Sequence, residues 1–126
     1  DMTLSETQIQ MDVVKWLDLV LPSGSIFHHS PNESLAKPQF RIKQARMGLR
    51  KGWCDLEIFC QRTWFHQDVR WGPIFIELKS EKGRLSPEQK QVLAMLDEAG
   101  CHTSVCRSVG EVTKFLQSLI QLKCGN

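Results

Sequence analysis

Several features that mark particular classes of protein are missing from this chain. No stretch approaches the roughly 20 apolar residues that a helix needs to span a bilayer, and no secretory signal is visible, so no membrane partner is expected. The five cysteines include no C-x-x-C pair, which argues against a zinc or dithiol redox site. Reduced thiols in the core of a cytoplasmic protein are the expectation. Internal repeats and low-complexity tracts are also absent.

Acidic residues are missing from one long segment, between Glu33 and Asp55. The basic residues of that segment are Lys37, Arg41, Lys43, Arg46, Arg50 and Lys51, and a second basic group comprises Lys79, Lys82, Arg84 and Lys90. The net charge of +2 does not by itself indicate nucleic-acid binding. Its uneven distribution, however, would draw a polyanion toward one part of the molecule. The alternative is a solvated basic surface without a partner.

The length and the hydrophobic pattern predict one α/β domain that spans residues 1–126. The content of 41% hydrophobic and 24% charged residues is ordinary for a globular domain with a modest core. The pattern predicts helices over 3–21, 86–100 and 112–122, strands over 25–30, 53–60, 73–79 and 101–107, an irregular basic segment over 31–52, and a hairpin half or insertion over 64–69. This order predicts a mixed central sheet flanked by helices.

Three charged residues, Asp55, Glu77 and Lys79, lie on short apolar segments that otherwise have the pattern of buried strands. Charges seldom occupy such positions without a specific role. Because side chains alternate along a strand, Glu77 and Lys79 share one face, as do Asp55 and Glu57. If the two strands are neighbours, carboxylates gather beside an ammonium group. Asp55 and Glu77 could then hold a hard divalent cation, which assists phosphodiester hydrolysis. Glu57 either supports this cluster or is a solvated carboxylate.

Capping-box patterns occur at three predicted helix starts, with the pairs Thr3 and Glu6, Ser86 and Gln89, and Ser108 and Glu111. Pro87 strengthens the second pattern, because proline fits the first turn of a helix. Glu6 has a second interpretation, since it lies one turn before Ile9 on the apolar stripe of its helix. It could therefore point toward the sheet, and its sequence context does not decide between the two roles.

The motifs resemble those of a known nuclease family. An aspartate at the start of one strand, followed by Glu77-Leu78-Lys79 in the next, resembles the PD-(D/E)XK nuclease superfamily. The segments 31–33, 48–56, 75–79 and 85–89 are similar in order and spacing to the virus-type replication-repair nuclease domain, VRR-NUC. One departure is Cys54, which stands where the family usually has proline before the aspartate. That proline shapes the backbone and does not bind metal, so the change affects local geometry only.

The resemblance implies a restriction-endonuclease-like α-β-β-β-α-β core of the stand-alone type found in phages and bacteria. It implies a Mg²⁺ or Mn²⁺ ion held by Asp55, Glu77 and the backbone carbonyl of Leu78, and no organic cofactor. Lys79 would orient the attacking water or offset negative charge. By the same resemblance, Gln89 and a glutamate of the first helix, Glu6 here, lie beside the metal, and the Asn32-Glu33 pair lies near the metal or the DNA. The cellular location expected is the cytoplasm of a bacterium or a phage-infected host.

The expected activity is that of a structure-selective DNA endonuclease. Stand-alone domains of this family resemble homodimeric Holliday-junction resolvases, so a four-way junction is the expected substrate, and the first helix and residues 60–71 are candidate dimer surfaces. The predicted DNA-binding residues are Asn32, Lys37, Arg41, Lys43, Arg46, Arg50, Lys51, Lys82 and Arg84. A nuclease for flap, single-stranded or linear DNA is one alternative. A catalytically idle DNA-binding module is another, against which the intact Asp55, Glu77 and Lys79 weigh.

Overall fold

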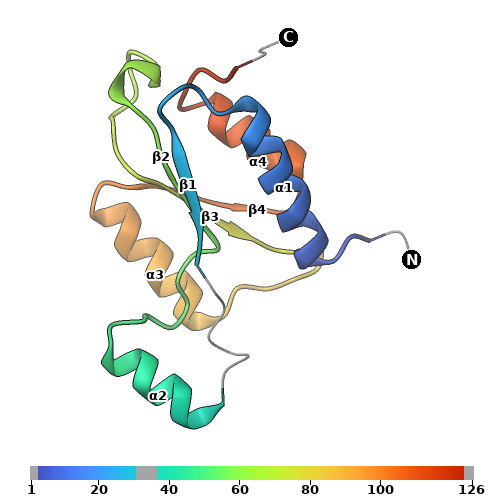
Figure 1. The fold of residues 1–126 in the computed structure, drawn as a ribbon, viewed down its shortest axis with the longest axis vertical. Helices are drawn as coiled ribbons and strands as arrows, with labels where there is room; N and C mark the ends of the chain where they lie inside the picture. The colour runs from blue at the N-terminus through green and yellow to red at the C-terminus, as the bar shows by residue number, and fades with distance from the viewer. Residues whose placement is uncertain (1–2, 31–36, 124–126) are drawn as a thin grey trace.

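The computed structural model describes residues 3–30 and 37–123, and a four-stranded sheet lies at its centre (Figure 1). Its strands are β1 (Ile26–His29), β2 (Leu56–Phe59), β3 (Ile74–Leu78) and β4 (His102–Cys106), in the spatial order β1-β2-β3-β4. The first three strands are antiparallel, whereas β4 runs parallel to β3. A parallel neighbour requires a crossover, and α3 (Pro87–Glu98) forms it. The predicted mixed sheet is therefore confirmed.

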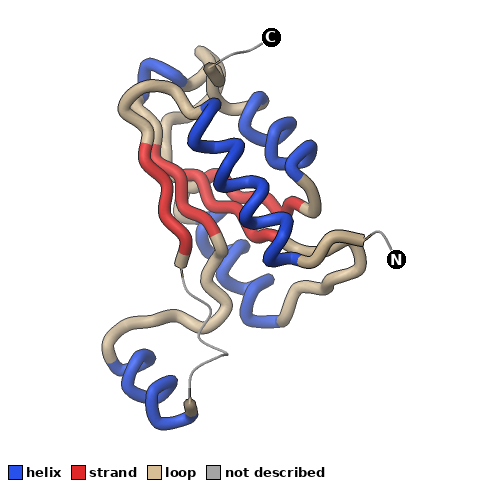
Figure 2. Tube along the Cα trace, turned by 45° about the vertical axis from the view of Figure 1, so that its right-hand side comes forward, coloured by secondary structure: helices blue, strands red, loops and turns tan. Residues whose placement is uncertain are grey.

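Helices cover both faces of this sheet. The helices α1 (Glu6–Val20) and α4 (Val109–Gln117) pack together on one face, and α3 lies on the other (Figures 1 and 2). Alternate residues of β3, such as Ile74 and Ile76, join the apolar core beneath α1 and α4. Each such fully buried side chain contributes about 1.5–3 kcal/mol to folding. The side chains of the intervening β3 residues point to the opposite face of the sheet, toward α3. Strand β3 is buried throughout, Glu77 included.

The segment expected to be irregular contains a helix, α2 (Pro38–Arg46). Lys37 has an extended backbone at its start and Pro38 fits its first turn. The sequence prediction missed it because α2 buries no residue and so has no apolar stripe. Gly48, whose φ of 104° is a left-handed conformation, follows its end. Figures 1 and 2 show α2 set apart from the sheet, beyond α3.

Two capping predictions were wrong in detail. The cap of α1 is Ser5, whose Oγ accepts a hydrogen bond from the Gln8 N–H at 3.1 Å, so Thr3 is not the cap. In α4, Ser108 Oγ accepts from the Glu111 N–H, but the Glu111 carboxylate accepts from the N–H of Arg107, one residue before the cap. The reciprocal half of that capping box is therefore absent. The box of α3 is complete.

The boundaries of other elements also differ from those predicted. Strand β2 is shorter than the segment 53–60, so Asp55 lies directly before it and not within it. Helix α4 begins earlier and ends earlier than predicted. The segment 64–69 is not half of a hairpin: a single 3₁₀ turn, η2 (Arg62–Trp64), is followed by an isolated bridge from Phe65 to Ile120.

No helix among residues 3–30 and 37–123 has the length and apolar character that a bilayer span requires.

Candidate active site

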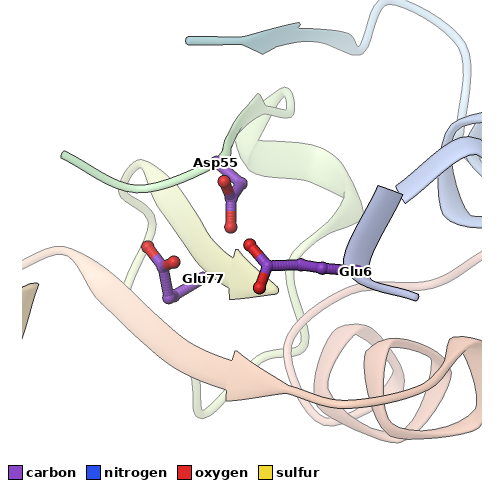
Figure 3. Close-up of side chains that lie close together, drawn as sticks. All are labelled: Glu6, Asp55 and Glu77. Atoms are coloured by element: carbon purple, nitrogen blue, oxygen red, sulfur yellow. The ribbon is translucent and has the colours of Figure 1, made fainter. Parts of the chain in front are cut away.

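Three carboxyl groups from three elements meet at one end of the sheet (Figure 3). The β2–β3 register pairs Leu56 with Ile76, so Asp55, one position further, lies opposite Glu77. The first residue of α1, Glu6, completes the group. One carboxylate oxygen from each of the three lies within 4.8 Å of the others. The expected neighbourhood of Asp55 and Glu77 is thus observed, and Glu6 points toward them.

The carboxylate of Asp55 has a fixed direction. Its Oδ2 accepts a hydrogen bond of 2.7 Å from the backbone N–H of Leu78, across the β2–β3 pair. The backbone carbonyl of Asp55 accepts a second bond, of 3.1 Å, from the N–H of Ser30 after β1. Asp55 is therefore held from both neighbouring strands, although it lies outside the ladder. The structure anchors Leu78 through its N–H, and the metal-binding role of its carbonyl stays a prediction.

Glu77 is the most buried charged residue of the described chain, with 1% of its surface exposed. Its Oε2 accepts a hydrogen bond from Gln89 Nε2 at 3.1 Å and lies 3.9 Å from Lys79 Nζ. Its Oε1 is buried and has no hydrogen-bond partner among the described residues. Buried polar atoms nearly always have a partner. This orphaned oxygen indicates that the site accommodates a group that the chain itself does not supply.

The electrostatics of the cluster lead to the same conclusion. Burial, reinforced by the nearby Asp55 carboxylate and by Glu6, raises the pKa of Glu77 to about 9, and Lys79 offsets only part of this. Burial also raises the pKa of Glu6, and here Lys79 lowers it while Asp55 raises it further. At a pKa of about 9, Glu77 keeps its proton at neutral pH in the absence of a cation, because ionising all three carboxyl groups would place three negative charges beside one ammonium group. A divalent cation would remove the excess negative charge, and hard cations prefer such oxygen donors.

Gln89 both caps α3 and contacts Glu77. Its Oε1 accepts a hydrogen bond of 2.9 Å from the Ser86 N–H, which completes the capping box of α3. Its Nε2 donates to Glu77 Oε2. Both contacts form at once because the two ends of an amide are a separate acceptor and donor. Gln89 therefore ties the orientation of Glu77 to the start of α3.

Glu57 lies outside the carboxylate cluster. Its Oε2 accepts hydrogen bonds from Trp53 Nε1 and, at 3.2 Å, from Ser30 Oγ, and its Oε1 lies 3.5 Å from His28 Nδ1. The Trp53 ring in turn packs edge-on against Phe75, with ring centroids 5.6 Å apart. Glu57 therefore supports the packing around the site and is not placed to bind the same cation.

Cys54, the departure from the family pattern, is a buried thiol of low reactivity. It is 1% exposed. Burial first, then the charges of Glu77, Asp55 and Glu57, raises the pKa of this thiol to about 12. Thiolates are the reactive and metal-binding form of cysteine. Cys54 therefore contributes packing at the start of β2 and no chemistry.

Arg107 is a supporting residue that the sequence prediction missed. Its Nη1 donates to the backbone carbonyls of Ser80 and Gly83, at 2.7 Å each, and of Glu81 at 3.3 Å. These carbonyls belong to the loop that directly follows Lys79. A lone arginine after a strand carries no motif. Only its position at the end of β4, the parallel neighbour of β3, could have indicated this contact.

Of the predicted DNA-binding residues, some line one cleft and others do not. Arg41, Lys51 and Arg84 line a cleft of about 760 Å³ between α2 and the start of α3, which Lys79 and Gln89 also line. Lys37, Lys43, Arg46 and Lys82 are exposed elsewhere, and Arg50 lies against α3, where its Nη2 is 3.5 Å from the Met95 sulfur. Asn32 and Glu33 lie outside the described residues.

Comparisons with known proteins identify the family. The VRR-NUC domain matches residues 1–110 of the chain. A solved structure described as a VRR_NUC domain protein superposes with a TM-score of 0.62 at 23% sequence identity, covering 91% of this chain and 87% of that chain. No curated protein matches. The family match spans far more than half of the sequence. The chain therefore belongs to the VRR-NUC domain family, a group of nucleases within the PD-(D/E)XK superfamily.

Proposed function

We propose that residues 1–126 form one domain, a Mg²⁺- or Mn²⁺-dependent endonuclease that hydrolyses phosphodiester bonds in DNA. Its family makes it a nuclease with DNA as the substrate, and nuclease domains of this superfamily usually use divalent metals. The observation that carries the proposal is the buried, partnerless Oε1 of Glu77 within a group of three carboxylates. A binding module would gain nothing from such an arrangement, because it costs folding energy.

The residues present fit the proposed ion. Asp55, Glu77 and Glu6 would hold it with carboxylate oxygens, and the carbonyl of Leu78 is the further ligand that the family resemblance implies. A bound ion of this kind supplies an activated water and neutralises charge on the phosphate. Asp55 is oriented by the Leu78 N–H, and Glu77 by Gln89. The ligands are therefore preorganised.

Lys79 acts through its charge and position. Its side chain is 11% exposed, and its Nζ lies 3.9 Å from Glu77 Oε2. In such a water-poor environment an ammonium group interacts with a phosphate more strongly than it does in bulk solvent. Lys79 would hold the attacking water or offset the negative charge that develops on the phosphate. The loop after Lys79 is held by Arg107, which limits the movement of this segment.

The proposed substrate is branched DNA, most specifically a four-way junction nicked by a homodimer. A phosphate is common to all sequences, so substrate choice comes from the shape and the assembly of the protein. A two-fold dimer would present two sites to two symmetric strands. Exposed apolar side chains on α1, such as Met11 and Leu19, and Trp71 in the 60–71 segment supply candidate contact area. Sedimentation at the monomer mass, with and without DNA, would contradict this assembly.

The test incubates the purified protein with a four-way junction, a flap, a single strand and a linear duplex, each with Mg²⁺, Mn²⁺ or a chelator. We expect symmetric nicks in the junction with metal and no cleavage with chelator. Equal cutting of all four DNAs would refute structure selectivity. Cleavage in chelator would refute the metal dependence, and failure to cut any DNA would favour the idle binding module.

A further inference from the structure

The cleft between α2 and α3 opens directly beside the carboxylate cluster. Lys79 and Gln89, which both contact Glu77, also line the cleft. Whatever lies in the cleft is therefore adjacent to the proposed position of the phosphate that is cut.

The cleft is positively charged. Arg41 comes from α2, Lys51 from the loop before Asp55, and Arg84 from the loop before α3. Within the described part of the chain, none of these three forms an ion pair. Among the residues that the structure describes, Glu88 is the one acidic residue that lines the cleft. Three cations without an ion-pair partner among the described residues, drawn from separate segments, attract an extended anion such as a nucleic-acid backbone.

The cleft also has an apolar component. Ile42 and Ala45 from α2, together with Leu49 and Leu85, line it alongside the cations. Ile42 is 63% exposed, although burial would be favourable for a side chain of this type. A phosphate-binding surface alone has no use for such residues. The face of an unstacked base is an apolar ligand, and single-strand sites combine a basic groove with surfaces that bases contact.

The volume of the cleft limits its ligand. A volume of about 760 Å³ lies within the range of roughly 300–1,000 Å³ that small-molecule sites occupy. One turn of duplex DNA is roughly 34 Å long, so a duplex could only lie across the opening. An unpaired nucleotide can enter, with its phosphates at the charged edge and its base against the apolar residues.

We propose that this cleft binds an unpaired segment of the DNA strand that is cut, adjacent to the scissile phosphate. The inference deepens the proposed function and rests on it for the position of that phosphate. Arg41, Lys51 and Arg84 hold the phosphates, and Ile42 and Leu49 contact the base. In a four-way junction, the unpaired nucleotides are those whose base pairs open at the branch point.

The first test compares two charge-removing variants of the same helix. Arg41 lines the cleft, whereas Lys43, also exposed on α2, does not. Binding of a short single-stranded oligonucleotide and of its duplex is measured by fluorescence anisotropy in chelator, at fixed salt. Arg41→Ala should weaken single-strand binding by about tenfold, because it removes one charge-assisted contact. It should weaken duplex binding much less. Lys43→Ala should weaken the binding of the single strand and of the duplex equally, and only slightly.

The second test leaves the charge unchanged. Ile42→Ala removes the apolar side chain from the cleft, and Met47→Ala, at an exposed position that ends the same helix, is the control. Ile42→Ala should weaken single-strand binding several-fold, since base contacts of this kind are favourable, and should leave duplex binding unchanged. Met47→Ala should change neither. Both positions are exposed, so the fold should persist, which circular dichroism verifies.

Two outcomes would overturn the inference. One is an equal effect of Arg41→Ala and Lys43→Ala on both DNAs, which would show a diffuse charge effect. The other is an Ile42→Ala variant that binds single strands as the wild type does. Because binding is measured without metal, a protein that binds as predicted but never cuts would refute the endonuclease and leave the cleft assignment standing. A protein that cuts DNA but does not bind single strands as predicted would refute the cleft assignment alone.

Discussion

Glu77 combines two properties that folding alone would not select. It is a carboxylate in a strand buried on both faces, and one of its oxygens has no partner among the described residues. Asp55 and Glu6 add like charge beside it. Each of these features destabilises the chain in the absence of a cation. Such a cost at a functional site is typical of proteins that balance stability against activity.

The variant Glu77→Gln should therefore be more heat-stable than the wild type in chelator. The folded-state pKa of Glu77, about 9, lies above the ordinary glutamate value of 4.5. The stability that protonation provides is complete below about pH 4.5 and is lost as the pH rises toward 9. At pH 8 we expect the melting temperature of Glu77→Gln to exceed that of the wild type by a few degrees, with a flatter pH profile. Asp55 and Glu6 remain to offset the Lys79 charge.

Calorimetry between pH 5 and 9 checks this, with Glu98→Gln, an exposed carboxylate at the end of α3, as the control. Mg²⁺ should stabilise the wild type at pH 8 and should stabilise Glu77→Gln much less. A Glu77→Gln protein that melts below the wild type in chelator at pH 8 would contradict the electrostatic description of the cluster.

Two variants at the start of α3 distinguish the capping role of Gln89 from its contact with Glu77. Ser86→Ala removes the serine half of the capping box and leaves the contact of Gln89 with Glu77 possible, whereas Gln89→Ala removes both. Both variants should lose roughly 1 kcal/mol of stability. Only Gln89→Ala should lower kcat, by about tenfold, with little change in KM. Equal kcat values in the two variants would show that Gln89 merely caps the helix, and Gln91→Ala, exposed on α3, controls for loss of an amide.

At the scale of elements, a glycine sets the distance between two segments. Gly52 has a φ of 85°, and a Cβ at this position would lie 2.6 Å from the backbone carbon of Glu88 and 2.8 Å from the backbone nitrogen of Gln89. The loop before Asp55 therefore rests directly on the first turn of α3. This contact positions Gln89 against Glu77 and closes one side of the cleft.

Gly48 provides the matched control for this contact. It also has a positive φ, but a Cβ there would meet nothing within 4 Å. Gly48→Ala and Gly52→Ala should therefore share the backbone strain, about 1 kcal/mol. Gly52→Ala should in addition displace the start of α3 and lower the cleavage rate by at least tenfold. Similar cleavage rates in two folded variants would show that the contact of Gly52 with α3 is unimportant for the site.

The elements that the sequence predicted are those whose signals are local or periodic. The alternation in β3 predicted the shared face of Glu77 and Lys79, and the capping box predicted the start of α3. Helix α2 could not be predicted this way, because it packs no apolar face against the sheet. The contacts of Arg107 and the convergence of Glu6 depend on distances between segments far apart in the chain. Hydrophobic periodicity carries no information about such distances.

At the scale of the whole molecule, the sheet brings the carboxylate cluster together at one end of its two central strands, and the basic cleft lies beside it. The antiparallel pair β2–β3 brings Asp55 to Glu77, and the parallel crossover through α3 brings Gln89 to the same point. Helix α2 extends this site outward through the basic cleft. In the proposed function, the carboxylate cluster would carry the cutting and the surrounding surface the choice of DNA.

The most direct test is the rate at which Mg²⁺ triggers cleavage of a preformed complex with a four-way junction. Asp55→Ala and Lys79→Ala should each lower this rate by more than about 100-fold, while junction affinity in chelator changes little, because the basic surface carries binding. Asp97→Ala and Lys114→Ala, at exposed positions outside the cluster, should cut at the wild-type rate. An Asp55→Ala protein that cuts at nearly the wild-type rate would contradict the assignment of this site.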